Sequence, residues 1–125
     1  ELDFRDCPDL TQTILVVAAI HKIKLKISGV ESLIIKETDR LLAMKKELSK
    51  IGCNFYEENN LWILDVRGNE IDDNISFDTY NDHRMAMALA PVASIKDIYI
   101  NNPEVVIKSY PNYWDDLKRV GFIIT

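Results

Sequence analysis

Basic side chains stand near the expected starts of three helices. They are Lys36 and Arg40 at the second helix, His83 and Arg84 at the third, and Lys108 at the fourth. A helix N-terminus has free backbone N–H groups and a partial positive charge, so cations there are unfavourable unless an anion shares them. Arg binds carboxylate or phosphate as a fork and Lys as a point charge. If these helix ends converge, we expect a pocket that binds small anions. The simpler alternative for any single basic residue is a side chain that extends into solvent.

Two acidic side chains lie among these bases. Glu37 stands between Lys36 and Arg40, and Asp9 stands at the expected start of the first helix. A carboxylate near cations has a lowered pKa unless burial opposes this. Such a mixed cluster suits proton transfer beside an anionic substrate. The alternatives are a surface ion pair between Glu37 and Arg40, and a favourable charge at Asp9 in the first turn of its helix.

Four helices and several short strands must position these side chains. Helix periodicity, caps and stop signals predict helices over about 8–21, 39–51, 83–94 and 109–120. The expected caps are Thr38 or Asp39 for the second helix, Asp82 for the third and Ser109 for the fourth. Alternating or short apolar runs predict strands over 24–28, 53–57, 61–66, 75–77, 97–100 and 105–107, and a strand or extended lead-in over 33–35. A turn at 58–60 joins the hairpin, and 67–74 is a polar loop. The fold class is therefore α/β (α+β).

The same order of elements occurs twice along the chain. A shift of 72 residues without a gap aligns Ile35 with Ile107 and Lys36 with Lys108, and the element pattern agrees throughout. Few residues are identical, so chance similarity of two α/β segments remains the alternative. The repeat puts both lysines at equivalent places, each after an apolar triplet.

Composition limits the classes of protein that fit. The chain has 125 residues, 47% hydrophobic and 28% charged, with a net charge of −5. This profile fits one globular domain and excludes a disordered acidic tail, and its sign argues against nucleic acid as a partner. No apolar run is long enough for a membrane span, and no signal peptide is visible. Cys7 and Cys53 have no metal-ligand spacing, so reduced thiols in a cytoplasmic protein without a metal are expected.

Two motifs closely resemble the signatures of the EPSP synthase family. They are Lys36-Glu37-Thr38-Asp39-Arg40-Leu41 and Thr79-Tyr80-Asn81-Asp82-His83-Arg84-Met85-Ala86-Met87-Ala88, and Cys7-Pro8-Asp9 and Lys108-Ser109-Tyr110-Pro111 also fall where the family has similar segments. The resemblance implies the enolpyruvyl transferase fold, an inside-out α/β barrel of two domains with three βαβαββ units each. It identifies residues 1–125 as the C-terminal part of one domain, with repeat units of roughly 1–66 and 67–125 and the other domain absent.

The resemblance also implies an activity. Members transfer the enolpyruvyl group of phosphoenolpyruvate to the 5-hydroxyl of shikimate 3-phosphate, which gives EPSP and phosphate on the shikimate pathway to aromatic amino acids. Base, acid and cations suffice for this chemistry, so no metal and no cofactor is expected. Because the N-terminal domain supplies further groups, this chain alone is expected to be inactive.

Residue roles follow from the resemblance, position by position. Asp9 matches the proton acceptor at shikimate 3-phosphate, Lys36 a lysine that contacts the same substrate, and Ser32 falls where many members have an Asn contacting it. Glu37 matches the proton donor to the methylene carbon of phosphoenolpyruvate. The residues that match binding groups for phosphoenolpyruvate are Arg40, Arg84 and Lys108, and His83 matches a histidine that lines the site.

Two other functions remain open at this point. One is an enolpyruvyl transferase that acts on a UDP-amino sugar, although the two long motifs do not suit it. The other is a non-catalytic anion-binding module of the same fold. A sheet cut from its neighbouring unit leaves an uncovered edge and apolar faces, so we expect self-association or partial disorder near the N-terminus, where residues 1–6 lack their partners.

Overall fold

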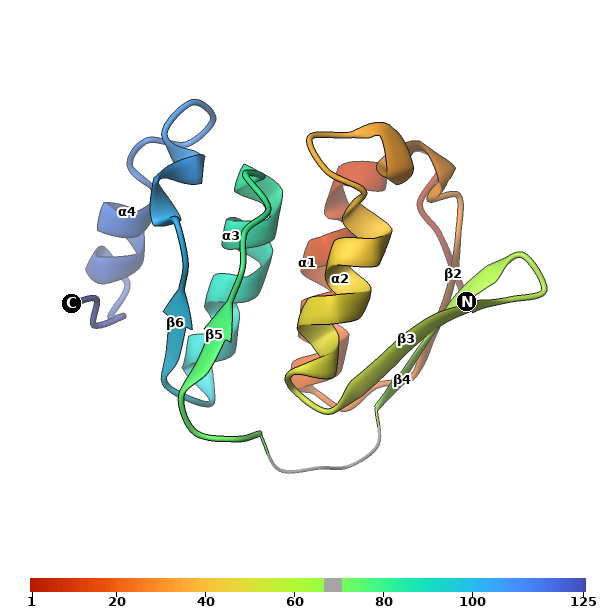
Figure 1. The fold of residues 1–125 in the computed structure, drawn as a ribbon, viewed down its shortest axis with the longest axis horizontal. Helices are drawn as coiled ribbons and strands as arrows, with labels where there is room; N and C mark the ends of the chain where they lie inside the picture. The colour runs from red at the N-terminus through yellow and green to blue at the C-terminus, as the bar shows by residue number, and fades with distance from the viewer. Residues whose placement is uncertain (67–70) are drawn as a thin grey trace.

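The computed structural model describes residues 1–66 and 71–125 as two β-sheets with helices between and beside them (Figure 1). The larger sheet has the order β1-β2-β4-β3 and consists of β1 (Leu2–Asp3), β2 (Leu25–Ser28), β3 (Cys53–Glu58) and β4 (Leu61–Val66). The smaller sheet pairs β5 (Ile75–Phe77) with β6 (Ile98–Ile100) in parallel. This mixed architecture confirms the predicted α/β class.

Three α-helices begin at the same end of the molecule, at the top of Figure 1. They are α1 (Thr11–Ile20), α2 (Arg40–Ser49) and α3 (His83–Leu89), and a fourth helix, α4 (Tyr113–Arg119), lies at the C-terminal side. Short 3₁₀ helices complete the chain: η1 (Pro8–Leu10), η2 (Glu31–Ile35), η3 (Ala90–Ser94) and η4 (Pro103–Val106). The common starting end is what brings the candidate site together.

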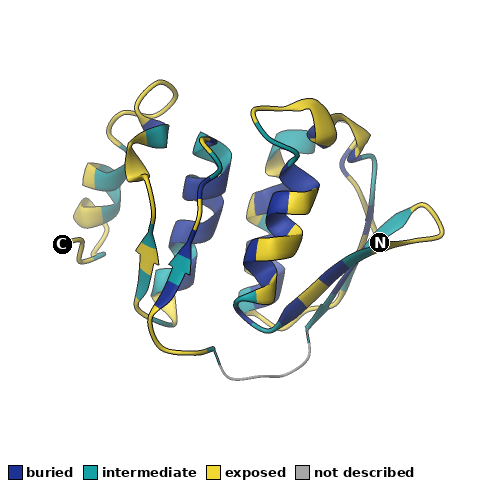
Figure 2. Ribbon diagram, in the orientation of Figure 1, coloured by how far each residue is buried: buried dark blue, intermediate teal, exposed yellow. Residues whose placement is uncertain are grey.

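One hydrophobic core extends from the larger sheet through the first three helices to β5 of the smaller sheet. The predicted stripe of α2 is buried at Leu41, Met44 and Leu48, because residues three and four apart share one helix face. Both Phe55 of β3 and Phe77 of β5 are fully buried. Figure 2 shows that α3 is largely buried, whereas α4 has no buried residue. A well-packed core therefore supports the starts of α1, α2 and α3.

The 72-residue spacing reappears in the arrangement of the elements. Four elements of the first part have a counterpart of the same kind about 72 residues later: α1 and α3, β2 and β6, η2 and η4, α2 and α4. The parallel pairings differ in register, since Leu2 lies opposite Ile27 but Ile75 lies opposite Ile98. The assignment of units of roughly 1–66 and 67–125 within one domain stays a prediction, and its boundary falls at residues outside the described part.

Two predicted strands are wrong. Residues 33–35 and 105–107 lie in or next to the 3₁₀ helices η2 and η4. Each apolar triplet has one buried anchor, Leu33 or Val106, and exposed or half-exposed neighbours. A strand would have had to pair along its length, whereas one 3₁₀ turn needs only a local hydrogen bond, such as Leu33 N–H to the Val30 carbonyl.

Three helix boundaries also differ from the sequence prediction. The third helix changes to 3₁₀ geometry at Ala90, because Pro91 has no N–H to donate; the Met87 carbonyl accepts the Tyr113 hydroxyl at 2.9 Å instead. The fourth helix begins at Tyr113, so its N-cap position is Asn112 and not Ser109, and the Asn112 side chain makes no cap hydrogen bond. The first begins as the 3₁₀ helix η1, with Pro8 in its first turn as expected.

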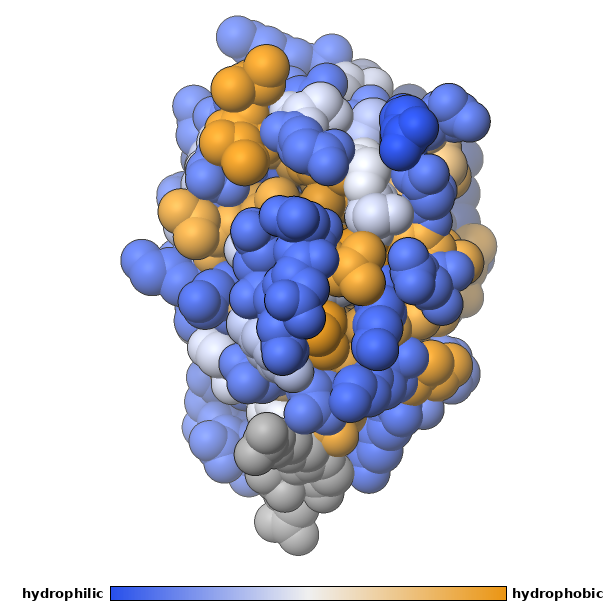
Figure 3. Space-filling view, turned by 90° about the vertical axis from the view of Figure 1, so that its right-hand side faces the viewer, coloured by the Kyte–Doolittle hydropathy of each residue, from blue (hydrophilic) through white to orange (hydrophobic). Residues whose placement is uncertain are grey.

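The N-terminal residues and the molecular surface test part of what was expected for a sheet cut from its neighbouring unit. The lack of partners at residues 1–6 is wrong, because β1 pairs in parallel with β2 and Phe4 is buried. The side of the larger sheet is mostly hydrophilic, with separate hydrophobic patches (Figure 3). Large apolar side chains are exposed at the C-terminal side, including Val120 and Ile123. Self-association stays a prediction.

No helix among the described residues is long and apolar enough to cross a membrane.

Candidate active site at three helix starts

Arg40, the first residue of α2, lies at the centre of the site. Its side chain is only 2% exposed, and Nε and Nη2 donate to the two carboxylate oxygens of Asp82 at 2.8 and 3.2 Å. This fork-to-fork contact is the geometry that makes an arginine–carboxylate pair strong. The start of α2 is fixed separately, because the Asp39 side chain accepts a hydrogen bond from Leu42 N–H, as the sequence predicted.

Asp82 ties the start of α2 to the start of α3. Its carboxylate is fully buried and also accepts from Arg84 N–H at 2.9 Å, so it caps α3 while it pairs with Arg40. The cap was expected from the sequence, but the pair with Arg40 was not. The signal in the sequence was a carboxylate close before the apolar residues 85–89, since a carboxylate buried with them requires a partner.

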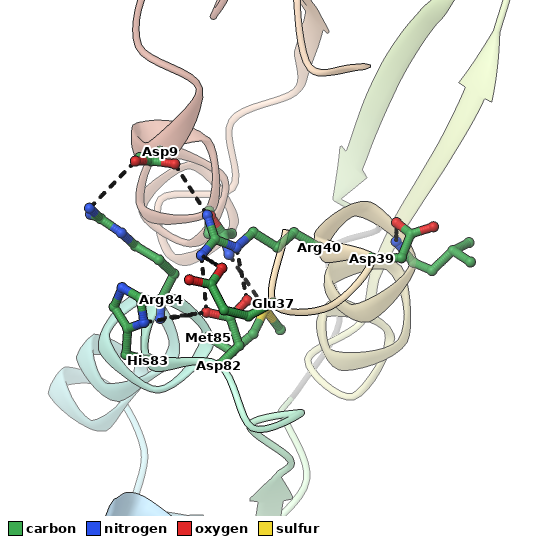
Figure 4. A network of polar contacts seen from close by, with 10 residues as sticks. Asp9, Glu37, Asp39, Arg40, Asp82, His83, Arg84 and Met85 are labelled. Atoms are coloured by element: carbon green, nitrogen blue, oxygen red, sulfur yellow. Dashed lines mark hydrogen bonds and ion pairs between the residues drawn. The ribbon is translucent and has the colours of Figure 1, made fainter. Parts of the chain in front are cut away.

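Two half-exposed carboxylates complete the contacts of Arg40. Nη1 donates to Asp9 at 3.2 Å and Nη2 to Glu37 at 2.6 Å, and these acidic side chains are 47% and 46% exposed. Arg84 reaches the other oxygen of Asp9 at 3.6 Å. Figure 4 shows these groups pointing toward one another from three helix starts. We call Asp9, Glu37, Arg40, Asp82 and Arg84 the Arg40 cluster.

The guanidinium of Arg40 is nearly saturated. Its contacts use four of the five N–H donors of an arginine. An incoming anion can therefore bind Arg40 through two donors only after Asp9 or Glu37 moves. By contrast, Arg84 is 38% exposed, and Asp9 is the only ion-pair partner of its side chain among the described residues. The starts of the second and third helices converge as expected and the start of the first joins them, but Lys108 at the fourth is not part of the cluster. Two arginines face three carboxylates, so the Arg40 cluster is not the purely basic pocket that the bases alone suggested.

The surroundings of Glu37 lower its pKa. The largest cause is a hydrogen bond from its own backbone N–H, and burial opposes the shift in part. The charges of Arg40, His83 and Lys36 lower the pKa further. Glu37 is thus held as a carboxylate while these contacts last.

Known proteins match both the sequence and the fold of this chain. The sequence model of the EPSP synthase family (3-phosphoshikimate 1-carboxyvinyltransferase) matches residues 1–117. The chain belongs to the EPSP synthase family. A 3-phosphoshikimate 1-carboxyvinyltransferase of Bacteroides fragilis (strain ATCC 25285) is 46% identical over 123 residues, which cover 96% of this chain and 30% of that protein. One of Clostridium novyi (strain NT) is 43% identical over 130 residues, 98% of this chain and 28% of the relative.

A solved structure supports the same fold. The 2.37 Å structure of EPSP synthase from Acinetobacter baumannii matches with a TM-score of 0.75 and 23% identity, over 91% of this chain and 27% of that chain. This likeness confirms the expected enolpyruvyl transferase fold. The chain spans about 30% of the length of the curated relatives it matches.

The other predicted site residues of this family member lie around the Arg40 cluster or apart from it. His83 places Nδ1 3.9 Å from the Asp82 carboxylate and is mostly buried. Ser32 is exposed on η2, and Lys36 is exposed just after it. Lys108 is exposed beyond η4. The side chains of Lys36 and Lys108 make no hydrogen bond or ion pair with another described residue, so both ammonium groups can receive an anion.

The carboxylates and His83 do not form a metal site. Among residues 1–66 and 71–125, no group of three or more His, Cys, Asp and Glu side chains has an arrangement that could hold a metal ion. The carboxylates are instead turned to the arginines (Figure 4). The arrangement can bind small anions, and it can give and take protons beside them.

Proposed function

We propose that this chain is the C-terminal part of an enzyme that transfers the enolpyruvyl group of phosphoenolpyruvate to the 5-hydroxyl of shikimate 3-phosphate, giving EPSP and phosphate. The observation that carries this proposal is the convergence of Asp9, Glu37, Arg40 and Arg84 from three helix starts, in a chain of the EPSP synthase family. The proposal includes a place in the cytoplasm, on the shikimate pathway to aromatic amino acids. The rest of the enzyme is the partner that completes the site.

Phosphoenolpyruvate needs cations for its carboxylate and its phosphate. Arg84 and Lys108 are exposed enough to meet an anion directly, and we assign both to this substrate. Arg40 takes the carboxylate after one of its own carboxylate partners gives way. Charge-assisted hydrogen bonds from fixed arginines orient the substrate and stabilise charge that develops in the transition state.

Asp9 and Glu37 carry the proton transfers in this proposal. The oxygen of the 5-hydroxyl forms a bond to the central carbon of phosphoenolpyruvate, its proton passes to Asp9, and Glu37 gives a proton to the methylene carbon, which becomes a methyl group. In the elimination, Glu37 takes a proton back from that methyl group, the C–O bond to phosphate breaks, and the proton held by Asp9 leaves with the phosphate, which restores the double bond in EPSP and both carboxyl groups. Both carboxylates lie half-exposed on the same guanidinium, so both can reach a ligand there.

Binding of the substrate itself prepares Glu37 as an acid. The Arg40 cluster already has one more carboxylate than arginine. A further carboxylate on Arg40 displaces Glu37 from Nη2 and adds negative charge beside it, and both changes raise the pKa of Glu37. The lowered pKa of Glu37 in the free chain is therefore compatible with a proton donor in the complex.

Shikimate 3-phosphate is assigned to the opposite side of the same cluster. Asp9 accepts from the 5-hydroxyl, Lys36 contacts the substrate with an ammonium group that has no hydrogen bond or ion pair with another described residue, and Ser32 donates one hydrogen bond. The serine side chain is shorter than the Asn of many family members, so it holds the substrate less tightly. His83, backed by Asp82, lines this side of the site.

The test is an assay of the protein encoded by the complete reading frame that contains this chain. With phosphoenolpyruvate and shikimate 3-phosphate, we expect phosphate and EPSP in equal amounts, and little or none from residues 1–125 alone. Arg84→Gln should lower kcat/KM for phosphoenolpyruvate about 100-fold. Arg119→Gln changes an arginine that is 80% exposed on α4 and serves as the matched control.

Two results would contradict the proposal. Phosphate release only with a UDP-amino sugar as acceptor would identify the sister activity. No phosphate release with either acceptor, while the folded protein still binds phosphoenolpyruvate, would identify a non-catalytic anion-binding module.

A further inference from the structure

A second buried charge on α2, Glu47, contacts the loop that carries Asp82. Glu47 is 1% exposed and lies seven residues after Arg40, two helical turns along the same face. Its Oε1 accepts from Asp78 N–H and from Lys50 Nζ, both at 2.7 Å, and its Oε2 accepts from the Tyr80 hydroxyl at 2.7 Å. We call Glu47, Lys50, Asp78 and Tyr80 the Glu47 cluster.

The loop over residues 78–82 leads from β5 into α3 and has a backbone that needs support. Tyr80 and Asn81 have φ angles of 54° and 55°, so two consecutive residues with a Cβ are in the left-handed region. Such a conformation persists only where surrounding contacts over-determine it. The Asp82 N–H to Thr79 carbonyl hydrogen bond, at 2.8 Å, closes the loop internally but does not attach it to α2.

Both ends of the 78–82 loop are attached to α2 by side chains. Asp78 and Tyr80 are held by Glu47, and Asp82 is held by Arg40. Burial raises the pKa of Tyr80, and the Glu47 carboxylate raises it further, so the hydroxyl remains a hydrogen-bond donor throughout the neutral range. The loop therefore has a fixed place relative to the helix that carries Arg40.

We propose that Glu47 and Tyr80 are positioning residues, which fix Asp82 and, through it, the direction in which the Arg40 guanidinium meets its anion. This inference rests on the proposed function, in which Arg40 takes the carboxylate of phosphoenolpyruvate. At 1% exposure Glu47 acts through the 78–82 loop and not by contact with a ligand. Because Asp82 occupies two of the guanidinium donors, a small rotation of its carboxylate turns the donors that remain for Asp9, Glu37 or substrate.

The first test removes one hydroxyl in the protein encoded by the complete reading frame. In Tyr80→Phe, we expect KM for phosphoenolpyruvate to rise roughly three- to tenfold, as when part of a charge-assisted hydrogen bond is lost, with KM for shikimate 3-phosphate unchanged. Tyr113→Phe is the matched control: its hydroxyl also bridges two elements, α4 and α3, but ends at the Met87 carbonyl outside the 78–82 loop. The control should stay within about twofold of wild type. A purely structural loss would lower the active fraction and leave KM unchanged.

Two substitutions of Glu47, the acceptor of the Tyr80 hydroxyl, extend the same test. Glu47→Gln keeps the volume and one acceptor oxygen, so its KM for phosphoenolpyruvate should lie between those of wild type and Glu47→Ala. If Glu47→Ala does not fold, Tyr80→Phe and Glu47→Gln carry the comparison. Equal effects of Glu47→Gln and Glu47→Ala on KM would contradict an effect transmitted through the hydrogen bond to Tyr80.

A second measurement separates this inference from the proposed function. The Nε–H proton of Arg40, bonded to Asp82, should exchange slowly with water in NMR spectra of the wild type, and roughly fivefold faster or more in Tyr80→Phe. If the wild type transfers no enolpyruvyl group, the proposed function fails, but this exchange rate still decides whether Tyr80 holds Asp82 on Arg40. Unchanged exchange overturns the inference. Faster exchange with unchanged KM in an active enzyme overturns its link to substrate binding.

Discussion

Helix α2 has one buried charge near each end of the same face, Arg40 at its first position and Glu47 at its eighth. The two side chains are equally buried, at 2% and 1% exposure, and both contact the 78–82 loop. Their partners differ in kind. Arg40 has three carboxylates, two of them half-exposed, whereas Glu47 has a backbone N–H, a phenol and a single lysine.

This difference separates a reactive site from a structural support. In the Arg40 cluster, carboxylates in excess compete for one guanidinium, and those that reach solvent can exchange places with a substrate anion. In the Glu47 cluster, each oxygen of the buried carboxylate has its donors. The Asp78 carboxylate shares only Lys50, with an oxygen 3.7 Å from Nζ, and the phenol and the backbone N–H are bonded to Glu47. Burial of a charge alone therefore does not mark function; a surplus of exchangeable partners does.

The largest effect should come from breaking the Arg40 cluster at its centre. Arg40→Met leaves Asp82 buried without a cation and should cost about 3–5 kcal/mol of unfolding free energy, measured by urea denaturation. Adding Asp82→Asn, which can still cap α3, should recover part of this loss. Arg119→Met, on an exposed arginine, should change stability by less than about 0.5 kcal/mol. A loss below about 1 kcal/mol for Arg40→Met would show that the pair is not effectively buried.

The next effect should appear in catalysis without a matching loss of stability. Glu37→Gln removes the proposed proton donor, so kcat should fall roughly 100-fold, or about 2.7 kcal/mol, in steady-state assays of the complete enzyme. The half-exposed ion pair with Arg40 contributes little to folding, so the denaturation midpoint should hardly move. Glu57→Gln, on the exposed part of β3, is the matched control. A fall in kcat of less than threefold would exclude Glu37 as the donor.

A substitution in the Glu47 cluster should lower stability more than it lowers kcat, the opposite of Glu37→Gln. Glu47→Ala leaves the Tyr80 hydroxyl and Asp78 N–H without their acceptor and should cost about 2 kcal/mol of unfolding free energy. The remaining kcat at saturating phosphoenolpyruvate should stay within about threefold of wild type in the folded fraction, because no proton donor or acceptor is lost. Glu57→Ala controls for loss of a carboxylate at an exposed position. A kcat loss as large as that of Glu37→Gln would abolish the distinction between the two clusters.

The sequence predicts local features of this fold well. Asp39 and Asp82 were expected as helix caps, and both accept the backbone N–H bonds of a cap. The hairpin of β3 and β4 also follows the prediction, with Asn59 and Asn60 in the left-handed conformation that tight hairpin turns need. These features are set by residues within a few positions of one another.

The features that could not be predicted from the sequence depend on contacts between residues far apart in the chain. The motifs identified most members of the Arg40 cluster, but the Arg40–Asp82 pair joins residues 42 positions apart and depends on the backbone of the 78–82 loop. The same holds for Glu47 and Tyr80, which are 33 positions apart. The strand predicted at 33–35 was wrong because a short apolar triplet has no period that separates a strand from a 3₁₀ turn.

The smallest effect concerns the pH dependence of stability, and it tests how exchangeable Glu37 is. Its pKa lies below the ordinary value of 4.5, so ionised Glu37 stabilises the fold above that pH, and the contribution is lost as pH falls through the lowered pKa. Because the side chain is half-exposed, solvent screening limits the contribution to about 0.5 kcal/mol or less. Glu37→Gln should therefore be slightly less stable than wild type at pH 7 and equal to it near pH 2, in urea denaturation at both pH values. Saturating phosphoenolpyruvate should shrink the difference attributable to Glu37 at pH 7, because the ligand takes over Arg40; a larger difference with ligand would mean that Glu37 keeps its place on the guanidinium.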